Sequence, residues 1–269
     1  MVKLIATDMD GTLLNSNHEI PSDFKDTIND LKEKNVVFAI STGRNYLDIS
    51  YKFDDYKDEL LFICENGSAI YYKDECIYSK FLEKDTINKL VKLGREIDNA
   101  YPVLCGTKGL YLEDEKALES LNTLFPMNVP VMKVDSLLDV EDGIFKVNMF
   151  DLIDSETNSY SIFKKENIEN VTLTPSGKYW LDMFSFGTNK GIAIKRVQDM
   201  FNIDYKETMV FGDHLNDIEM MESAYYSYAM KNGHKDVKKV ANFQTKYTNE
   251  ECGVIKTIQE EILKSKELA

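Results

Sequence analysis

Two aspartates, Asp8 and Asp10, directly follow the short apolar run Leu4–Thr7 near the start of the 269-residue chain. One residue separates them and a glycine, Gly11, comes next, so a turn lets both carboxylates approach one point. Buried carboxylates are costly without a cation, and carboxylate oxygens are ligands that Mg²⁺ prefers. We therefore expect a magnesium site where this first strand ends.

Two other β-rich runs, 36–40 and 209–211, also end in residues that could take part in chemistry. The ligands of open α/β sheets bind at the carboxyl ends of strands, so these residues should meet Asp8. Hydroxyls and backbone amides at a glycine turn suit phosphate oxygens, and further carboxylates suit a metal. The residues concerned are Thr42 and Gly43 after the first run, and Asp213, Asn216 and Asp217 after the second.

A lysine, Lys190, lies at the start of the helix predicted over 190–200. The helix dipole does not favour a cation there, which indicates that Lys190 serves another purpose, such as neutralising anionic charge. Carboxylates for a metal, a hydroxyl and amides for phosphate, and one lysine together favour phosphoryl transfer. In such chemistry a carboxylate can act as the nucleophile and form an aspartyl-phosphate.

Buried strands and helices alternate in the first and last parts of the chain, which predicts an α/β fold with a doubly wound, mainly parallel, Rossmann-like sheet. The middle has a different pattern, with helices among strands that look half exposed. We interpret it as an inserted α+β domain whose sheet has one open face. The predicted boundaries are 1–82 and 188–269 for the core and 83–187 for the insertion.

Composition excludes several classes of partner. The formal net charge of −14 argues against nucleic acid or an anionic membrane surface as a partner, because no basic field would attract either. The four cysteines form no CxxC pair, so the sequence predicts neither a zinc site nor a disulfide framework. Without a signal-peptide pattern or a long apolar run, we expect a soluble cytoplasmic protein, either a monomer or a small homo-oligomer.

The motifs, taken in order, resemble those of the haloacid dehalogenase (HAD) superfamily, specifically the Cof-type phosphatases of class IIB, which carry a C2 cap. The resemblance covers essentially the whole chain and implies a HAD core, with residues 83–187 as a cap that selects the substrate. The motifs are Asp8-Met9-Asp10-Gly11-Thr12-Leu13-Leu14, Ser41-Thr42-Gly43-Arg44, Glu65-Asn66-Gly67, Asn189-Lys190-Gly191 and Gly212-Asp213-His214-Leu215-Asn216-Asp217.

The resemblance implies a role for each matching residue. Asp8 would be the nucleophile and a Mg²⁺ ligand. Asp10 would protonate the leaving oxygen and then activate water, while its carbonyl binds the metal. Thr42 and the backbone amides of Gly43 and Met9 would bind phosphate, and Asn216 would contact it. Lys190 would pair with Asp8 and the phosphate. Asp213 and Asp217 would bind the metal.

The sequence singles out four further residues whose roles are less specific. His214 stands where the family usually has a small residue, and the sequence leaves its role open. We interpret Arg44 as forming a salt bridge that anchors the following helix. Tyr179 and Trp180 lie on a strand of the predicted cap, where they could stack on a sugar or other ring, although packing is the more common use of an aromatic side chain.

The function that we expect is a Mg²⁺-dependent phosphatase acting on a small phosphate ester, such as a sugar phosphate or a phosphorylated cofactor. A phosphomannomutase-like phosphotransferase is one alternative, although it should have several arginines in the cap, where the sequence has only Arg95. A non-catalytic phospho-acceptor module is another. Such modules are single domains without a cap, and they lack a second acid in the role of Asp10.

Overall fold

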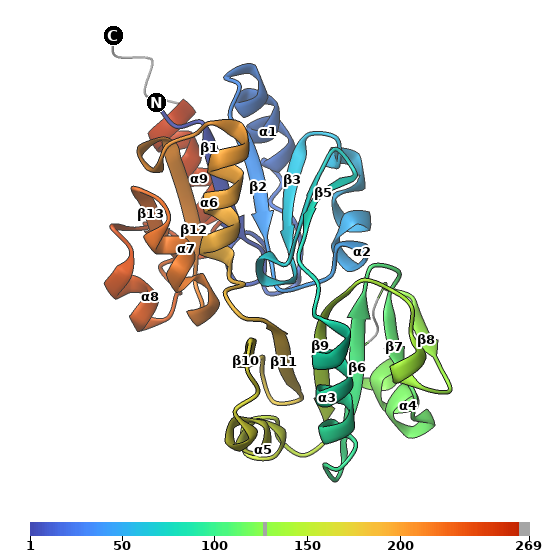
Figure 1. The fold of residues 1–269 in the computed structure, drawn as a ribbon. Helices are drawn as coiled ribbons and strands as arrows, with labels where there is room; N and C mark the ends of the chain where they lie inside the picture. The colour runs from blue at the N-terminus through green and yellow to red at the C-terminus, as the bar shows by residue number, and fades with distance from the viewer. Residues whose placement is uncertain (126–127, 264–269) are drawn as a thin grey trace. The chain divides into compact units, whose positions relative to one another are not determined.

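The computed structural model describes residues 1–125 and 128–263. It divides into two compact units, each with its own sheet (Figure 1). Unit 1 comprises Met1–Arg44, Phe53–Tyr78 and Asn189–Ala269, and unit 2 comprises Asn45–Lys52 and Ser79–Thr188. Among the described residues, no helix combines the length and the apolar character that a membrane span requires.

The described part of unit 1 is built on an eight-stranded sheet. Its strands are β1 (Leu4–Asp8), β2 (Val37–Ser41), β3 (Leu60–Cys64), β4 (Ala69–Tyr72), β5 (Glu75–Ser79), β12 (Thr208–Gly212), β13 (Tyr226–Ala229) and β14 (Phe243–Gln244). Their spatial order is β14-β13-β12-β1-β2-β3-β4-β5, and the neighbours from β14 to β3 run parallel. This arrangement confirms the predicted doubly wound sheet.

Helices cover both faces of this sheet (Figure 1). They are α1 (Phe24–Glu33), α6 (Lys190–Phe201), α7 (Ile218–Glu222), α8 (Lys235–Val240) and α9 (Gly253–Ile258), with short turns η1 (Ser50–Tyr56), η2 (Glu65–Gly67), η4 (Tyr205–Glu207), η5 (Leu215–Asp217) and η6 (Gln259–Leu263). Apolar residues of α6, α7 and α8 pack on one face, against side chains that include Leu4 and Val210. On the other face Phe24 of α1 contacts Phe38, with ring centroids 5.8 Å apart.

The helix predicted from Lys190 onward does begin at that residue. The side-chain oxygen of Asn189 caps it by accepting a hydrogen bond from the Ile192 N–H at 2.8 Å. Asparagine is a favoured N-cap because its oxygen satisfies one of the free amides of the first turn. The cap therefore fixes where the helix starts and, with it, the position of Lys190.

The described part of unit 2 holds a six-stranded sheet in the order β10-β11-β9-β6-β7-β8. Most of its neighbours run antiparallel, and helices α3 and α5 pack on one face. The elements are α2 (Tyr46–Ile49), α3 (Lys84–Gly94), β6 (Ala100–Gly106), β7 (Leu110–Leu112), α4 (Glu115–Leu124), β8 (Val131–Lys133), η3 (Leu137–Asp139), β9 (Ile144–Asp151), α5 (Ser159–Glu166), β10 (Val171–Pro175) and β11 (Trp180–Ser185).

The prediction that this second sheet has one open face is wrong at its centre. Every residue of β9 is buried, including the polar Lys146 and Asn148, which are each 7% exposed. The Nζ atom of Lys146 lies 3.4 Å from Oδ2 of Asp182 on β11. The polar alternation of β9 therefore includes a buried ion pair, whereas the sequence pattern alone indicated a solvated face.

Candidate active site

The register of the unit 1 sheet brings the chemically important strand ends together. Asp8 is the last residue of β1 and pairs with Ser41, the last residue of β2. On its other side β1 pairs in parallel with β12. Thr42 and Asp213 directly follow β2 and β12, so they flank Asp8 at the carboxyl edge, which is where ligands bind in open α/β sheets.

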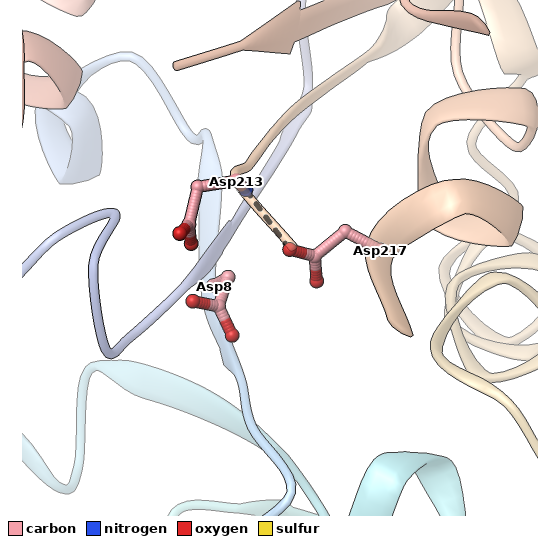
Figure 2. A group of neighbouring side chains, drawn as sticks. All are labelled: Asp8, Asp213 and Asp217. Atoms are coloured by element: carbon pink, nitrogen blue, oxygen red, sulfur yellow. Dashed lines mark hydrogen bonds between the residues drawn. The ribbon is translucent and has the colours of Figure 1, made fainter. Parts of the chain in front are cut away.

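Three aspartates form an acidic cluster at this edge (Figure 2). Asp8, Asp213 and Asp217 each offer a carboxylate oxygen, and these oxygens all lie within 4.8 Å of one another. Asp8 and Asp217 are buried, and Asp213 is half-buried. The sequence expectation that acids from distant segments converge here agrees with this geometry.

Lys190 lies against the same cluster and is completely buried. Its Nζ atom donates hydrogen bonds to Oδ1 of Asp8 at 2.5 Å and to Oδ1 of Asp217 at 2.7 Å. Burial alone lowers the pKa of Lys190, but the attraction of Asp217 and Asp8 outweighs it and holds the pKa above its ordinary value. The ammonium group is therefore charged at neutral pH.

The charges in this cluster do not balance. Burial raises the pKa of Asp8 well above its usual range, and repulsion from Asp217 and Asp213 adds to this effect, although Lys190 opposes it. Burial likewise raises the pKa of Asp213. Three carboxylates against one ammonium leave two negative charges when all are ionised. This set of hard oxygen donors fits a divalent cation such as Mg²⁺.

Asp217 holds two parts of the site in place through both of its carboxylate oxygens. Oδ2 accepts hydrogen bonds from the backbone amides of Asp213 and His214, each at 3.0 Å, while Oδ1 accepts from Lys190. The Thr12 hydroxyl donates to Oδ1 of Asp213 at 2.7 Å. The sequence assigned no separate role to Thr12, although it lies within the motif at 8–14.

A second group of contacts organises the loop predicted to bind phosphate. Thr42 is buried, and its backbone carbonyl accepts a hydrogen bond from the backbone N–H of Asn66 at 3.0 Å. The Asn66 side-chain oxygen accepts from Nδ2 of Asn216 at 3.1 Å. A Cβ atom added to Gly43 would lie 3.2 Å from the side-chain amide of Asn66. Asn66 thus contacts three of the five residues predicted to bind phosphate, and the turn at 65–67 was the only sequence signal for it.

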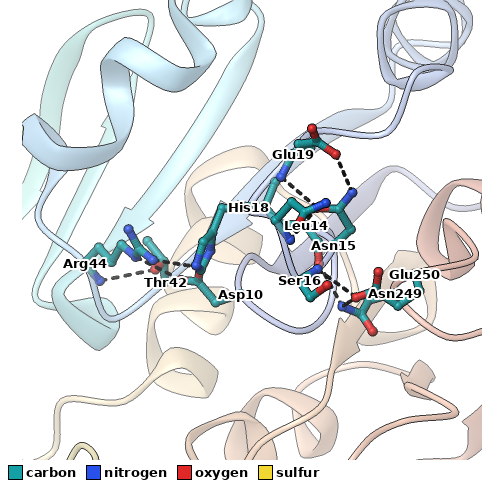
Figure 3. Close-up of polar contacts among 11 residues, drawn as sticks. Asp10, Leu14, Asn15, Ser16, His18, Glu19, Thr42, Arg44, Asn249 and Glu250 are labelled. Atoms are coloured by element: carbon teal, nitrogen blue, oxygen red, sulfur yellow. Dashed lines mark hydrogen bonds and ion pairs between the residues drawn. The ribbon is translucent and has the colours of Figure 1, made fainter.

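Asp10 is oriented differently from the acidic cluster. Its carboxylate accepts hydrogen bonds from Arg44, Nε to Oδ2 at 2.9 Å and Nη2 to Oδ1 at 2.8 Å (Figure 3). The His18 ring nitrogen Nδ1 lies 3.2 Å from the same Oδ1. Arg44 does form a salt bridge, and its partner is an acid of the predicted catalytic motif. The contact with His18 was not predicted from the sequence.

The structure also places the other residues named from the sequence. The Met9 side chain is buried, and its carbonyl accepts hydrogen bonds from the amides of the two residues at 13 and 14. His214 is exposed, and its ring centroid lies 6.4 Å from that of His234. Tyr179 and Trp180 contact Phe125, with ring centroids 5.8 and 5.5 Å away, which agrees with a packing role.

Comparison with known proteins gives relatives along almost the whole chain. The chain is 27% identical over 260 residues to a 5-amino-6-(5-phospho-D-ribitylamino)uracil phosphatase of Escherichia coli K12, covering 96% of this chain and 95% of that protein. A solved structure from Streptococcus mutans UA159 matches with a TM-score of 0.86 at 31% identity, covering 97% and 98% of the two chains. A sugar phosphatase of HAD subclass IIB has the same fold, with a TM-score of 0.79 at 22% identity, covering 96% and 98%.

The family assignment follows from the extent of these matches. A model of the haloacid dehalogenase-like hydrolases matches residues 5–258, and this span contains all the residues of the acidic cluster. The solved structures confirm the predicted combination of a Rossmann-like core and an inserted α+β segment. The chain is therefore an enzyme that belongs to the haloacid dehalogenase-like hydrolases and has the fold of their Cof-type, subclass IIB phosphatases.

Proposed function

We propose that the chain is a Mg²⁺-dependent phosphatase that hydrolyses small organic phosphate monoesters through an aspartyl-phosphate on Asp8. The main support is the buried contact between Asp8 and Lys190 within a group of three carboxylates. A carboxylate at the carboxyl edge of the sheet, next to a fixed positive charge, is suited to accept a phosphoryl group. The family of the chain supports the same reaction class.

The proposed reaction has two steps. In the first, Asp8 attacks phosphorus, the bond to the leaving oxygen breaks, and Asp10 gives that oxygen a proton. In the second, Asp10 takes a proton from water as the water oxygen attacks phosphorus, which releases inorganic phosphate and frees the Asp8 carboxylate. Each step requires a correctly placed acid or base, and such groups typically contribute about 10² to 10⁴ in rate.

The same proposal assigns the binding groups. Lys190, Asn216 and the Thr42 hydroxyl, with the backbone amides of Gly43 and Met9, would hold the phosphoryl oxygens. Asp8, Asp213 and the Asp10 carbonyl would hold Mg²⁺, with Asp217 supporting the site. When bound, Mg²⁺ would neutralise the charge on the transferring group. The assignment of residues 83–187 as a cap that selects the leaving group is part of the proposal and rests on the family resemblance.

The substrate class is a small phosphorylated sugar, sugar alcohol or cofactor. The E. coli relative, which covers nearly the whole chain, is named for a phosphate ester on a ribityl side chain. We therefore include 5-amino-6-(5-phospho-D-ribitylamino)uracil among the candidate substrates, together with sugar phosphates, pyridoxal phosphate and FMN.

The decisive experiment is to measure inorganic phosphate release from this panel by the purified protein. We expect release with Mg²⁺, loss of release with EDTA, and recovery when Mg²⁺ is added in excess. No release from any substrate, or release at the same rate in EDTA, would contradict the proposal. Transfer of phosphate to a second sugar hydroxyl in place of water would favour the phosphomannomutase-like alternative.

A further inference from the structure

The bidentate ion pair between Asp10 and Arg44 links the two loops that carry the proposed chemistry, those that follow β1 and β2. Asp10 lies two residues beyond the proposed nucleophile, and Arg44 lies two residues beyond Thr42 in the proposed phosphate-binding loop. Because β1 and β2 are adjacent parallel strands, the loops that follow them are neighbours. One arginine therefore bridges the acid–base loop and the phosphate loop within unit 1.

The arginine contacts Asp10 and Thr42 at the same time. Its guanidinium donates separate hydrogen bonds to both carboxylate oxygens of Asp10. Its backbone amide donates to the Thr42 hydroxyl oxygen at 3.2 Å. A bidentate arginine–carboxylate pair fixes the plane of the carboxylate, whereas a single contact leaves it free to rotate. Arg44 thus sets the orientation of Asp10 relative to the loop that contains Thr42.

A further contact on Asp10, to the same Oδ1, comes from a loop that is itself held by hydrogen bonds (Figure 3). His18, which has a left-handed backbone with φ of 59°, places Nδ1 against Oδ1 of Asp10. The Asn15 side chain bonds to Glu19, and the Ser16 amide donates to Glu250. The Asp10 carboxylate therefore has a defined environment, although it is 37% exposed.

We propose that Arg44 is a positioning residue for the acid–base step, because its bidentate contact holds the Asp10 carboxylate in the orientation that proton transfer requires. This inference rests on the proposed function, since it assigns Arg44 a role through Asp10. An exposed ion pair without such a role contributes little to stability. The two interpretations of Arg44 therefore differ in what its removal does to catalysis.

A double-mutant cycle tests the coupling, with 4-nitrophenyl phosphate and Mg²⁺ as the assay. We expect Arg44→Met to lower kcat about tenfold, a part of the usual effect of an acid–base group, with KM changed less than about twofold. In the Asp10→Asn background the same change should lower kcat less than about twofold, because the group it positions is already inactive. Arg44→Lys should fall between Arg44→Met and the wild type, since lysine keeps the charge but cannot make the planar fork.

A second measurement does not depend on the residual activity of Asp10→Asn. An alkyl phosphate such as glycerol 2-phosphate needs protonation of its leaving oxygen far more than an aryl phosphate does. Arg44→Met and Arg44→Lys should therefore lose more kcat/KM on the alkyl ester, because kcat/KM covers only the formation of the aspartyl-phosphate, in which the leaving oxygen is protonated. Arg95→Gln is the matched control, because it removes another bidentate arginine–carboxylate pair, with Glu113, and should leave the kinetics on both esters unchanged.

Each outcome has a defined meaning. Equal losses of kcat in the wild-type and Asp10→Asn backgrounds, a rise in KM alone, or equal losses of kcat/KM on both esters would overturn the inference and leave the phosphatase proposal intact. Unchanged kinetics in Arg44→Met would do the same, since the pair would then be an ordinary surface contact. A wild-type protein with no Mg²⁺-dependent activity would overturn both. If Arg44→Met fails to fold, Arg44→Lys provides the same comparisons.

Discussion

The Nζ atom of Lys190 lies 2.5 Å from Oδ1 of Asp8, although 182 residues separate the two along the chain. Asp8 ends β1, whereas Lys190 begins α6, so the contact is made when the first and last parts of the chain form one sheet and its covering helices. It is also buried, which makes the charge on each partner depend on the other. The proposed nucleophile and its counter-ion are thus held in place by the fold.

Replacement of the proposed nucleophile should abolish turnover. Asp8→Asn keeps the shape of the side chain but removes the charge and the attacking oxygen, so we expect a loss of about a thousandfold or more in kcat on 4-nitrophenyl phosphate. Circular dichroism checks that the variant is folded. Asp30→Asn, an exposed aspartate on α1, serves as the control and should retain full activity. Activity of Asp8→Asn within a few-fold of the wild type would remove Asp8 from the mechanism.

Asp213 and Asp217 should respond differently to the loss of their charge. Burial raises the pKa of Asp213, so its ionised form is unfavourable without a metal. Asp213→Asn should therefore be as stable as the wild type in EDTA, but it should need more Mg²⁺ for activity. In Asp217→Asn the new NH₂ group would face either Lys190 or two backbone amides, which are all donors. We expect that variant to lose both stability and activity.

Thermal unfolding with and without Mg²⁺ measures this difference. Binding to the folded state alone raises Tm, so Mg²⁺ should stabilise the wild type and have little effect on Asp213→Asn. Asp217→Asn should already have a lower Tm in EDTA. If Mg²⁺ raised the Tm of Asp213→Asn as much as that of the wild type, Asp213 would not be a metal ligand.

The site was largely predictable because its residues lie in short motifs at the ends of buried strands. Parallel strands that end in Asp, Thr and Gly indicate a shared edge, and Asp8, Thr42 and Asp213 do follow from that rule. The orientation of Asp10 was not predictable in the same way. A side-chain rotamer depends on its neighbours in space, and Arg44 is 34 residues away in the chain.

The second unit shows where sequence patterns mislead. The central strand β6 contains Pro102, and because proline usually argues against a central strand, the sequence alone does not indicate this position. The buried polar residues of β9 suggested a solvated face, since the partner of Lys146 lies 36 residues away. A charged side chain is buried only with a counter-ion beside it, and the sequence does not say which distant residue supplies that counter-ion.

Gly11 provides a test of how closely the loops of the site are packed. Its φ of +80° is strained for other residues, and a Cβ atom would lie 2.7 Å from Oδ2 of Asp213. Gly11→Ala should lower the free energy of unfolding by about 1–3 kcal/mol and raise the Mg²⁺ concentration needed for activity. Gly177→Ala is the matched control, because Gly177 has φ of +89° and nothing within 4 Å of the added carbon. Equal Mg²⁺ requirements in the two variants would show that Asp213 is not displaced.

Asp142 in unit 2 predicts a pH dependence of stability. Burial opposes its ionisation, but hydrogen bonds from Thr107, Tyr111 and the backbone amides of Lys108 and Gly143 prevail and lower the pKa of Asp142. A carboxyl group with a lowered folded-state pKa stabilises the protein above its ordinary pKa, and that contribution is lost as pH falls through the folded-state value. Asp142→Ala should therefore lower Tm at pH 7, where the ionised group contributes fully.

The difference in Tm between the wild type and Asp142→Ala should shrink as pH falls below about 4, the ordinary pKa of an aspartate. Differential scanning calorimetry at a series of pH values measures it. Asp154→Ala is the control, because the Asp154 side chain accepts hydrogen bonds from Thr157 within one exposed turn, and its effect at pH 7 should be smaller. A Tm difference for Asp142→Ala that does not shrink below about pH 4 would contradict the prediction, because the unfolded chain binds a proton at Asp142 below its ordinary pKa and the stabilisation must then fall.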